Sequence, residues 1–213
     1  MKRFIGKDED DILHQFEYYI WGDNFGYIPI TKVMSSSINH CFLNQFAKIV
    51  KPLEMGYRSN MSELADLLSE RKTFAFVRNP WSRFVSAFRF QIQNNNYNEN
   101  YYKFYGIRSA TSFSACLEIL LRLSNEDLDK HFRPQYSQLF HNGKQIPEFI
   151  GQLENSEEDW ITVCDRYIGE YRELPRVNEQ EFLRYQDYFD DKGLLSKFNE
   201  KYEMDIEIFG YTF

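Results

Sequence analysis

The stretch FAFVRNPWSRFVSAF, residues 74–88, constrains the fold of this chain more than any other, because an apolar run in it stops at an arginine. The run TFAFV, residues 73–77, has the length of one strand, and its uninterrupted apolar residues indicate burial on both faces. Pro80 suits the first turn of a helix, and the residues after it place apolar side chains at helical spacing. The stretch predicts a buried strand, a short turn and a helix, with Arg78 at the carboxyl end of the strand.

Strand and helix patterns alternate along the rest of the chain. YIPI, residues 27–30, predicts a strand, and the spacing of apolar residues in 35–50 predicts a helix that reaches Ile49, capped by Ser36 or Ser37. The remaining patterns predict helices at 61–71, 111–123, from 156 onward and at 191–202, a strand within 146–155, and a polar loop or helix end at 91–102. This alternation favours an α/β fold with a central parallel sheet flanked by helices, in a single domain over residues 1–213.

The composition excludes several classes of protein. With 43% hydrophobic residues, including 20 Phe and 15 Tyr, the chain can fill a core, and its net charge of -7 argues against a general nucleic-acid binder. The cysteines Cys41, Cys116 and Cys164 follow neither a metal-binding nor a disulfide pattern, which favours a reducing compartment. No apolar stretch has the length of a signal peptide or of a membrane span. We therefore expect a cytoplasmic protein without stable membrane insertion.

The first strand-to-helix junction carries a lysine and three consecutive serines. Lys32 follows the strand at 27–30, and Ser35, Ser36 and Ser37 stand where the next helix begins. A cation, hydroxyls and the amides of a helix N-terminus together suit a phosphate, although the GxxxxGK[ST] pattern of a P-loop is absent. The alternative is a solvated lysine beside an ordinary serine cap.

The second junction is the stretch at 74–88, where Arg78 leaves the strand and Ser86 follows eight residues later. In open α/β sheets, ligands bind at the carboxyl ends of the strands. The guanidinium fork of Arg78 suits phosphate oxygens, and a hydroxyl two helical turns along could contact the same anion. The alternative is an exposed arginine and a serine tolerated within a packed helix.

The two junctions together resemble the sulfotransferases that use 3′-phosphoadenosine-5′-phosphosulfate (PAPS), and among them the carbohydrate sulfotransferase branch. Residues 31–37, TKVMSSS, resemble the loop that binds the 5′-phosphosulfate, with Thr31 in place of a proline. Residues 78–88, RNPWSRFVSAF, are similar to the family's 3′-phosphate motif at nearly every position. Further similar segments are DKHFRPQ at 129–135, FIGQLEN at 149–155, LPRVN at 174–178, and the terminal Tyr202, Asp205 and FGY at 209–211.

The resemblance implies a fold, a donor and a set of donor-binding residues. The fold would be the P-loop-NTPase-like sulfotransferase fold, and the donor would be PAPS, which leaves as adenosine 3′,5′-bisphosphate. No metal is required. The 5′-phosphosulfate would be bound by Lys32, Val33, Met34, Ser35, Ser36 and Ser37, with Lys32 as a catalytic residue, and the 3′-phosphate by Arg78 and Ser86.

The acceptor would be a hydroxyl of a carbohydrate or a similar molecule, and it needs a base. His131 lies in the family-like segment DKHFRPQ, and an imidazole can accept a proton near neutral pH. Asp129 would orient His131 only if the turn brings the two together. One alternative is a structural role for His131, with Glu54 or His40 as the base. A separate alternative is that Arg133 faces the substrate or the sulfate. The oligomeric state and the acceptor stay open.

Two other functions compete with sulfuryl transfer. The first is an ATP-dependent P-loop kinase or nucleotide hydrolase, against which the missing GxxxxGK[ST] pattern argues. The second is a non-catalytic module that binds a nucleotide or a glycan, which would keep the donor-binding residues without a base.

Overall fold

The computed structural model describes residues 19–21, 25–42, 48–50, 72–94, 99–108, 111–175 and 184–213. These residues form two compact units. The sheet unit comprises the described residues between 19 and 78 and between 137 and 175, and the helical unit those between 79 and 136 and between 184 and 213. Compact units of this kind occur within single domains as well as between domains, so one domain over residues 1–213 stays a prediction.

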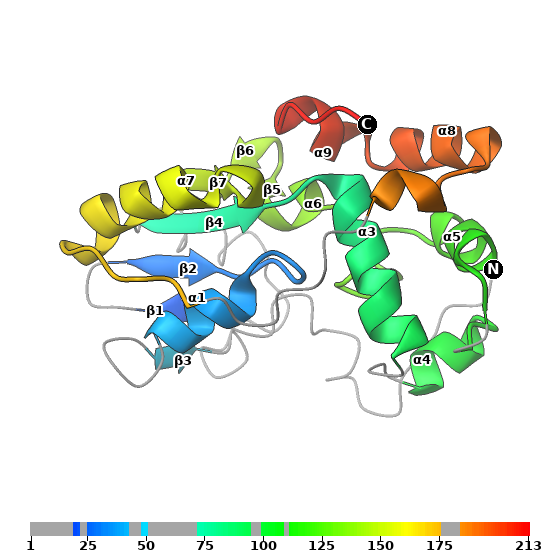
Figure 1. Ribbon diagram of the computed structural model, residues 1–213, viewed down its shortest axis with the longest axis horizontal. Helices are drawn as coiled ribbons and strands as arrows, with labels where there is room; N and C mark the ends of the chain where they lie inside the picture. The colour runs from blue at the N-terminus through cyan, green and yellow to red at the C-terminus, as the bar shows by residue number, and fades with distance from the viewer. Residues whose placement is uncertain are drawn as a thin grey trace. The chain divides into compact units, whose positions relative to one another are not determined.

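The sheet unit is built on a sheet whose described strands run in the order β3-β1-β2-β4-β7 (Figure 1). The strands are β1 (Tyr19–Trp21), β2 (Gly26–Ile28), β3 (Lys48–Val50), β4 (Thr73–Val77) and β7 (Phe149–Gln152). The three strands β2, β4 and β7 are parallel, whereas β1 pairs antiparallel with both β2 and β3. All five residues of β4 are buried, as its uninterrupted apolar run predicted. The predicted central parallel sheet is therefore confirmed, with an antiparallel extension beside β2.

Two helices of the sheet unit pack on the same face of the sheet, α1 (Ser35–Phe42) and α7 (Ser156–Val163). The ring of Phe42 in α1 lies 6.1 Å from that of Phe74 in β4 and 5.6 Å from that of Trp160 in α7. Both helices thus cover the face to which Phe74 points. The unit also contains all but the first residue of α6 (Tyr136–Leu139), the hairpin of β5 (Phe140–His141) and β6 (Lys144–Gln145), η5 (Leu153–Asn155) and the π-helix η6 (Cys164–Ile168).

Gly151 allows β4, β7 and α7 to approach closely. A Cβ at this position would lie 2.5 Å from the ring of Phe76 and 3.0 Å from the Cβ of Asp159. Asp159 also accepts a hydrogen bond from the amide of Gln152 at 2.6 Å, which ties α7 to the end of β7. Only a residue without a side chain fits at position 151 without moving the strands or the helix.

The helical unit has an aromatic core. Its elements are α3 (Pro80–Phe88), the π-helix η4 (Arg89–Gln93), α4 (Glu99–Phe104), α5 (Phe113–Leu121), η7 (Tyr185–Tyr188), α8 (Lys192–Lys201) and α9 (Glu203–Ile208). Phe84 of α3 lies edge-on to Phe113 of α5 at 5.8 Å and to Phe198 of α8 at 5.5 Å. Asn79 begins α3 by accepting a hydrogen bond from the amide of Ser82 at 3.0 Å, and Pro80 occupies the first turn as predicted.

The sequence was wrong about the extent of one helix. Residues 48–50 form β3, so the helix expected to reach Ile49 does not, and it begins at Ser35 without Ser36 or Ser37 as its cap. The helices expected after Pro80, at 111–123, from 156 and at 191–202 are confirmed as α3, α5, α7 and α8. The helix expected at 61–71 lies outside the described residues.

Within the described part of the chain, no helix has both the length and the apolar character needed to cross a membrane.

Candidate functional site

The turn that joins β2 to α1, residues 31–34, has an unusual backbone. Lys32 has a φ of 65° and Met34 a φ of 38°, a region that residues with a Cβ rarely adopt. Val33, which lies between them, is completely buried and fixes the turn to the core. Turns that place residues in the left-handed region can direct successive backbone N–H groups to one side and so form a concave site for an anion.

The serines after this turn begin α1. The first hydrogen bond of the helix runs from the amide of Ile38 to the carbonyl of Met34 at 3.1 Å, so the amides of Ser35, Ser36 and Ser37 precede the helical ladder. Ser36 is exposed, Ser35 is half-buried and Ser37 is buried. The N-terminal end of a helix carries a partial positive charge, which adds to the preference of the turn for an anion.

Lys32 and Arg78 lie together in the sheet unit, although 46 residues separate them. The strands before them, β2 and β4, are adjacent and parallel, so their carboxyl ends meet at the same edge of the sheet. The Nη1 of Arg78 donates a hydrogen bond to the carbonyl oxygen of Lys32 at 3.3 Å. The structure therefore brings Arg78 to the turn that carries Lys32.

The electrostatics of Lys32 follow from this arrangement. Burial and, to a smaller extent, the positive charge of Arg78 together lower the pKa of its ammonium from 10.5 to about 8. Two cations held at one edge of a sheet repel each other, and a ligand with two negative charges would remove that repulsion. The site thus has the electrostatic character of an anion site.

Ser86 and His131 belong to the helical unit. Ser86 lies on α3 and is 5% exposed. Arg83, one turn earlier on the same helix, is buried and directs its guanidinium to the segment that carries His131. Its Nη1 donates to the carbonyl of Arg133 at 2.9 Å and its Nη2 to the carbonyl of Lys130 at 3.0 Å, so α3 fixes both sides of His131.

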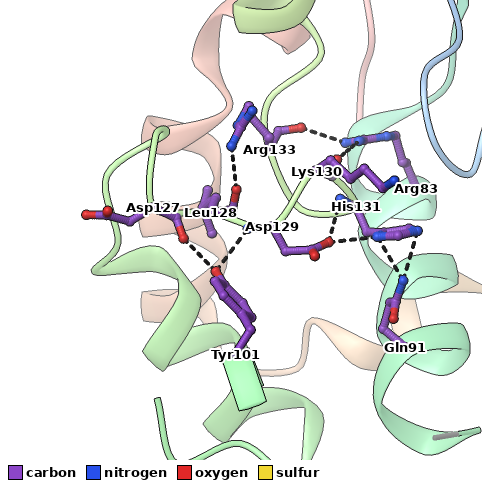
Figure 2. Close-up of polar contacts among 9 residues, drawn as sticks. All are labelled: Arg83, Gln91, Tyr101, Asp127, Leu128, Asp129, Lys130, His131 and Arg133. Atoms are coloured by element: carbon purple, nitrogen blue, oxygen red, sulfur yellow. Dashed lines mark hydrogen bonds and ion pairs between the residues drawn. The ribbon is translucent and has the colours of Figure 1, made fainter. Parts of the chain in front are cut away.

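His131 is held between a carboxylate and an amide (Figure 2). Its Nδ1 lies 2.7 Å from the Oδ1 of Asp129, which also accepts a hydrogen bond from the backbone amide of His131 at 2.9 Å. The Nε2 of Gln91, on η4, lies 2.8 Å from each of the two ring nitrogens. Burial raises the pKa of Asp129, but the charge of His131 and its hydrogen bonds outweigh this and hold the pKa below its usual value. The turn does bring Asp129 and His131 together.

The backbone around Asp129 is fixed from two further sides. The hydroxyl of Tyr101, on α4, donates to the carbonyl of Asp127 at 2.6 Å and accepts from the amide of Asp129 at 2.9 Å (Figure 2). The guanidinium of Arg133 donates from Nε to the carbonyl of Asn125 at 2.7 Å and from Nη2 to that of Leu128 at 2.7 Å. These bonds order the turn, so His131 is presented on a preorganised segment.

The C-terminal segment supports the same region of the helical unit. Asp205, which is fully buried, accepts hydrogen bonds from the amides of Gln135 at 2.8 Å and Tyr136 at 2.6 Å. The hydroxyl of Tyr202 donates to the carbonyl of Phe132. Two segments that the sequence singled out separately, 129–135 and 202–211, are therefore bonded to each other.

The structure also locates the alternatives for the base and for the acceptor side. His40 is exposed on α1 in the sheet unit, and Glu54 lies outside the described residues. Arg133 is buried and donates to backbone carbonyls, and burial lowers its pKa to about 10, so the structure gives it a structural role. Among the described residues, no group of three or more His, Cys, Asp or Glu side chains could hold a metal ion.

A model of the sulfotransferase family matches residues 22–212, nearly the whole chain. The chain belongs to the sulfotransferase family. A 106-residue segment of this sulfotransferase is also 35% identical to an uncharacterised protein of Archaeoglobus fulgidus, and the match covers 49% of the chain and 74% of the relative. No solved structure gives a significant match.

The sequence did not indicate that Gln91 and Tyr101 contact the segment that carries His131. Both lie in the polar stretch 91–102, which the sequence predicted to be a loop or a helix end. The π-helical hydrogen bond from the amide of Asn94 to the carbonyl of Arg89 at 3.0 Å places Gln91, and apolar spacing does not reveal such a turn. The signal for Asp205 was present, because it lies in the family-like C-terminus.

Proposed function

We propose that this sulfotransferase transfers a sulfuryl group from PAPS to a hydroxyl of a carbohydrate-type acceptor. The observation that carries the proposal is the pairing of Lys32 with Arg78 at the carboxyl ends of β2 and β4, beside the N-terminus of α1. The lowered pKa of Lys32 fits a site that binds an anion with more than one negative charge.

The donor-binding residues take the following roles in this proposal. PAPS supplies the sulfuryl group: the bond between sulfur and the bridging phosphate oxygen breaks as sulfur bonds to the acceptor oxygen, and adenosine 3′,5′-bisphosphate leaves. Lys32 and the first amides of α1 stabilise the charge that develops on the bridging oxygen, the role in which preorganised donors contribute most to catalysis. Ser35, Ser36 and Ser37 add hydroxyls, and Val33 and Met34 contribute through the backbone of the turn.

The 3′-phosphate contacts rest on the resemblance of residues 78–88 to the family motif. We assign them to Arg78, whose guanidinium fork suits phosphate oxygens, and to Ser86. These contacts orient the donor and contribute position rather than chemistry.

The base in this proposal is His131, which takes the proton of the acceptor hydroxyl as its oxygen bonds to sulfur. The ionised carboxylate of Asp129 can only accept hydrogen bonds, so the 2.7 Å contact favours a ring proton on Nδ1 and a lone pair on Nε2. That lone pair can take the proton of the acceptor hydroxyl once the hydroxyl replaces the amide of Gln91 as its hydrogen-bond donor. The ordered turn around His131 fits a group that must be held in one orientation.

Donor binding is tested by the melting temperature with adenosine 3′,5′-bisphosphate or with magnesium and ATP. A ligand at one hundred times its Kd stabilises a protein by about 2.7 kcal/mol. For a chain of this size we expect the bisphosphate to raise the melting temperature by roughly 5–10 °C, and ATP to raise it much less. The opposite order would favour a nucleotide-hydrolysing or kinase activity and reject the proposal.

Transfer itself is tested with sulfur-labelled PAPS and a panel of oligosaccharide, glycolipid and small hydroxyl acceptors. His131→Ala should lower kcat by ~10²–10⁴ through the loss of the base, while the bisphosphate still stabilises the variant. His141→Ala, in β5, serves as the matched control and should keep wild-type transfer. Wild-type transfer by the His131 variant would remove this residue as the base, and transfer to no hydroxyl would reject the reaction.

A further inference from the structure

The π-helical turn η4 places one amide side chain against the ring of His131. Gln91 is 4% exposed, whereas Gln93, two residues later in the same turn, is exposed. π-turns are rare and often lie at functional sites, because the wider turn redirects the side chains within it. Here the redirected side chain is Gln91, and the group it meets is His131 (Figure 2).

The two neighbours of the ring are compatible with one neutral tautomer. The carboxylate of Asp129 accepts hydrogen bonds only, so in this contact Nδ1 of His131 must be the protonated donor. The amide nitrogen of Gln91 lies 2.8 Å from both ring nitrogens and is a donor only, so its hydrogen bond needs a ring nitrogen with a lone pair. With the proton on Nδ1, that nitrogen is Nε2. The side chain of Gln91 thus satisfies Nε2 while leaving it unprotonated.

A glutamine suits this position because its amide serves both protonation states. Its NH₂ group donates to the neutral Nε2, and after a rotation its oxygen can accept from a protonated Nε2. A carboxylate at the same position would instead favour the imidazolium, and an apolar side chain would leave Nε2 without a partner whenever no acceptor is bound.

We propose that Gln91 is a positioning residue for His131, which together with Asp129 holds the ring proton on Nδ1 and keeps Nε2 unprotonated until the acceptor hydroxyl replaces the amide as its hydrogen-bond donor. The inference rests on the proposed function, because it assigns His131 the role of the base in sulfuryl transfer. Gln91 acts through His131 and not on the donor or the acceptor. Other charged or titratable groups around this turn include Arg83, Tyr101, Tyr102, Lys130 and Arg133.

The first test is the ring of His131 observed by ¹⁵N NMR in the unliganded chain, which needs no activity. The wild type should show the tautomer with the proton on Nδ1. In Gln91→Glu the added carboxylate should make the ring titrate about one pH unit higher, as expected for an opposite charge in contact. Gln93→Glu, the same substitution in the same turn, should shift the titration by no more than about 0.2 pH units at its exposed position.

The second test is the pH dependence of kcat/KM for sulfuryl transfer. The acidic limb of the profile should move up by about one pH unit in Gln91→Glu and should move to lower pH in Asp129→Asn, which loses a charge that favours the imidazolium. Gln91→Met, which adds no charge, should lower kcat roughly tenfold or more and leave the KM for PAPS within about twofold, because the loss affects the proton-transfer step.

The outcomes separate this inference from the proposed function. A ring with its proton on Nε2, or equal titration shifts in Gln91→Glu and Gln93→Glu, would overturn the positioning role even if the wild type transfers sulfate. A shifted ring titration in a protein that transfers no sulfate would support the contact and reject the reaction. If Gln91→Glu does not fold, wild-type kcat in Gln91→Met would also overturn the inference.

Discussion

Replacing Lys32 with methionine should stabilise the unliganded protein at neutral pH, although Lys32 is central to the proposed donor site. Burial and the neighbouring Arg78 lower the pKa of Lys32 from 10.5 to about 8, whereas the unfolded chain keeps the ordinary value. A lysine with a lowered pKa destabilises the folded state fully below the folded pKa, and this destabilisation disappears as the pH rises to the unfolded pKa. At pH 7, Lys32→Met removes the penalty and keeps the length of the side chain.

The size of the effect follows from the shift. Each pKa unit corresponds to about 1.4 kcal/mol, so the full shift from 10.5 to about 8 corresponds to roughly 3.5 kcal/mol as an upper value. Partial exposure of the side chain allows solvent to screen the charge, so we expect a gain of about 2 kcal/mol in the free energy of unfolding at pH 7. The gain should decline between pH 8 and 10.5, the window in which the folded and unfolded states bind different numbers of protons.

The assay is urea unfolding of wild type and Lys32→Met at pH 7, 8.5 and 10, with and without adenosine 3′,5′-bisphosphate. Lys72→Met, which replaces an exposed lysine directly before β4, is the matched control and should change the unfolding free energy by less than about 0.5 kcal/mol. The bisphosphate should stabilise the wild type and the control but not Lys32→Met. The electrostatic account of the site would be refuted if Lys32→Met were less stable than the wild type at pH 7. It would also be refuted if the difference in unfolding free energy were the same at every pH.

Two further substitutions test the packing that supports the sites. Gly151→Ala should destabilise the protein by about 1–3 kcal/mol in urea unfolding, because its Cβ would collide with the ring of Phe76. Gly193→Ala at the start of α8 should change the unfolding free energy by less than about 1 kcal/mol, because its Cβ would meet only the Oδ1 of Asp191, at 3.2 Å. Equal effects of the two glycine substitutions would contradict the close approach at position 151. Asp205→Asn should destabilise the protein by ~2–4 kcal/mol. The carboxylate of Asp205 accepts one hydrogen bond on each oxygen, from the backbone N–H groups of Gln135 and Tyr136, whereas an asparagine side chain has a single oxygen. An unchanged urea midpoint would show that these hydrogen bonds contribute little.

Much of the fold was predictable because its signals are local. The run at 73–77 and the proline at 80 fix a buried strand and a helix start from a few neighbouring residues, and both are observed. The failure at 48–50 has the opposite cause: helical spacing there is overridden by pairing with β1, which depends on residues distant in the sequence. Strands of three residues, such as β1, are too short to show a period.

The sequence by itself determined the family-like motifs and hence the donor-binding candidates, because residue types at fixed spacing within 31–37 and 78–88 carry that information. Only the tertiary structure decided which of these groups meet within each unit. Lys32 contacts Arg78 because β2 and β4 are neighbouring parallel strands, and burial together with the charge of Arg78 lowers the pKa of the lysine. Asp129, His131 and Gln91 meet because a π-turn and a hydrogen-bonded turn face each other, and no local pattern encodes such a contact.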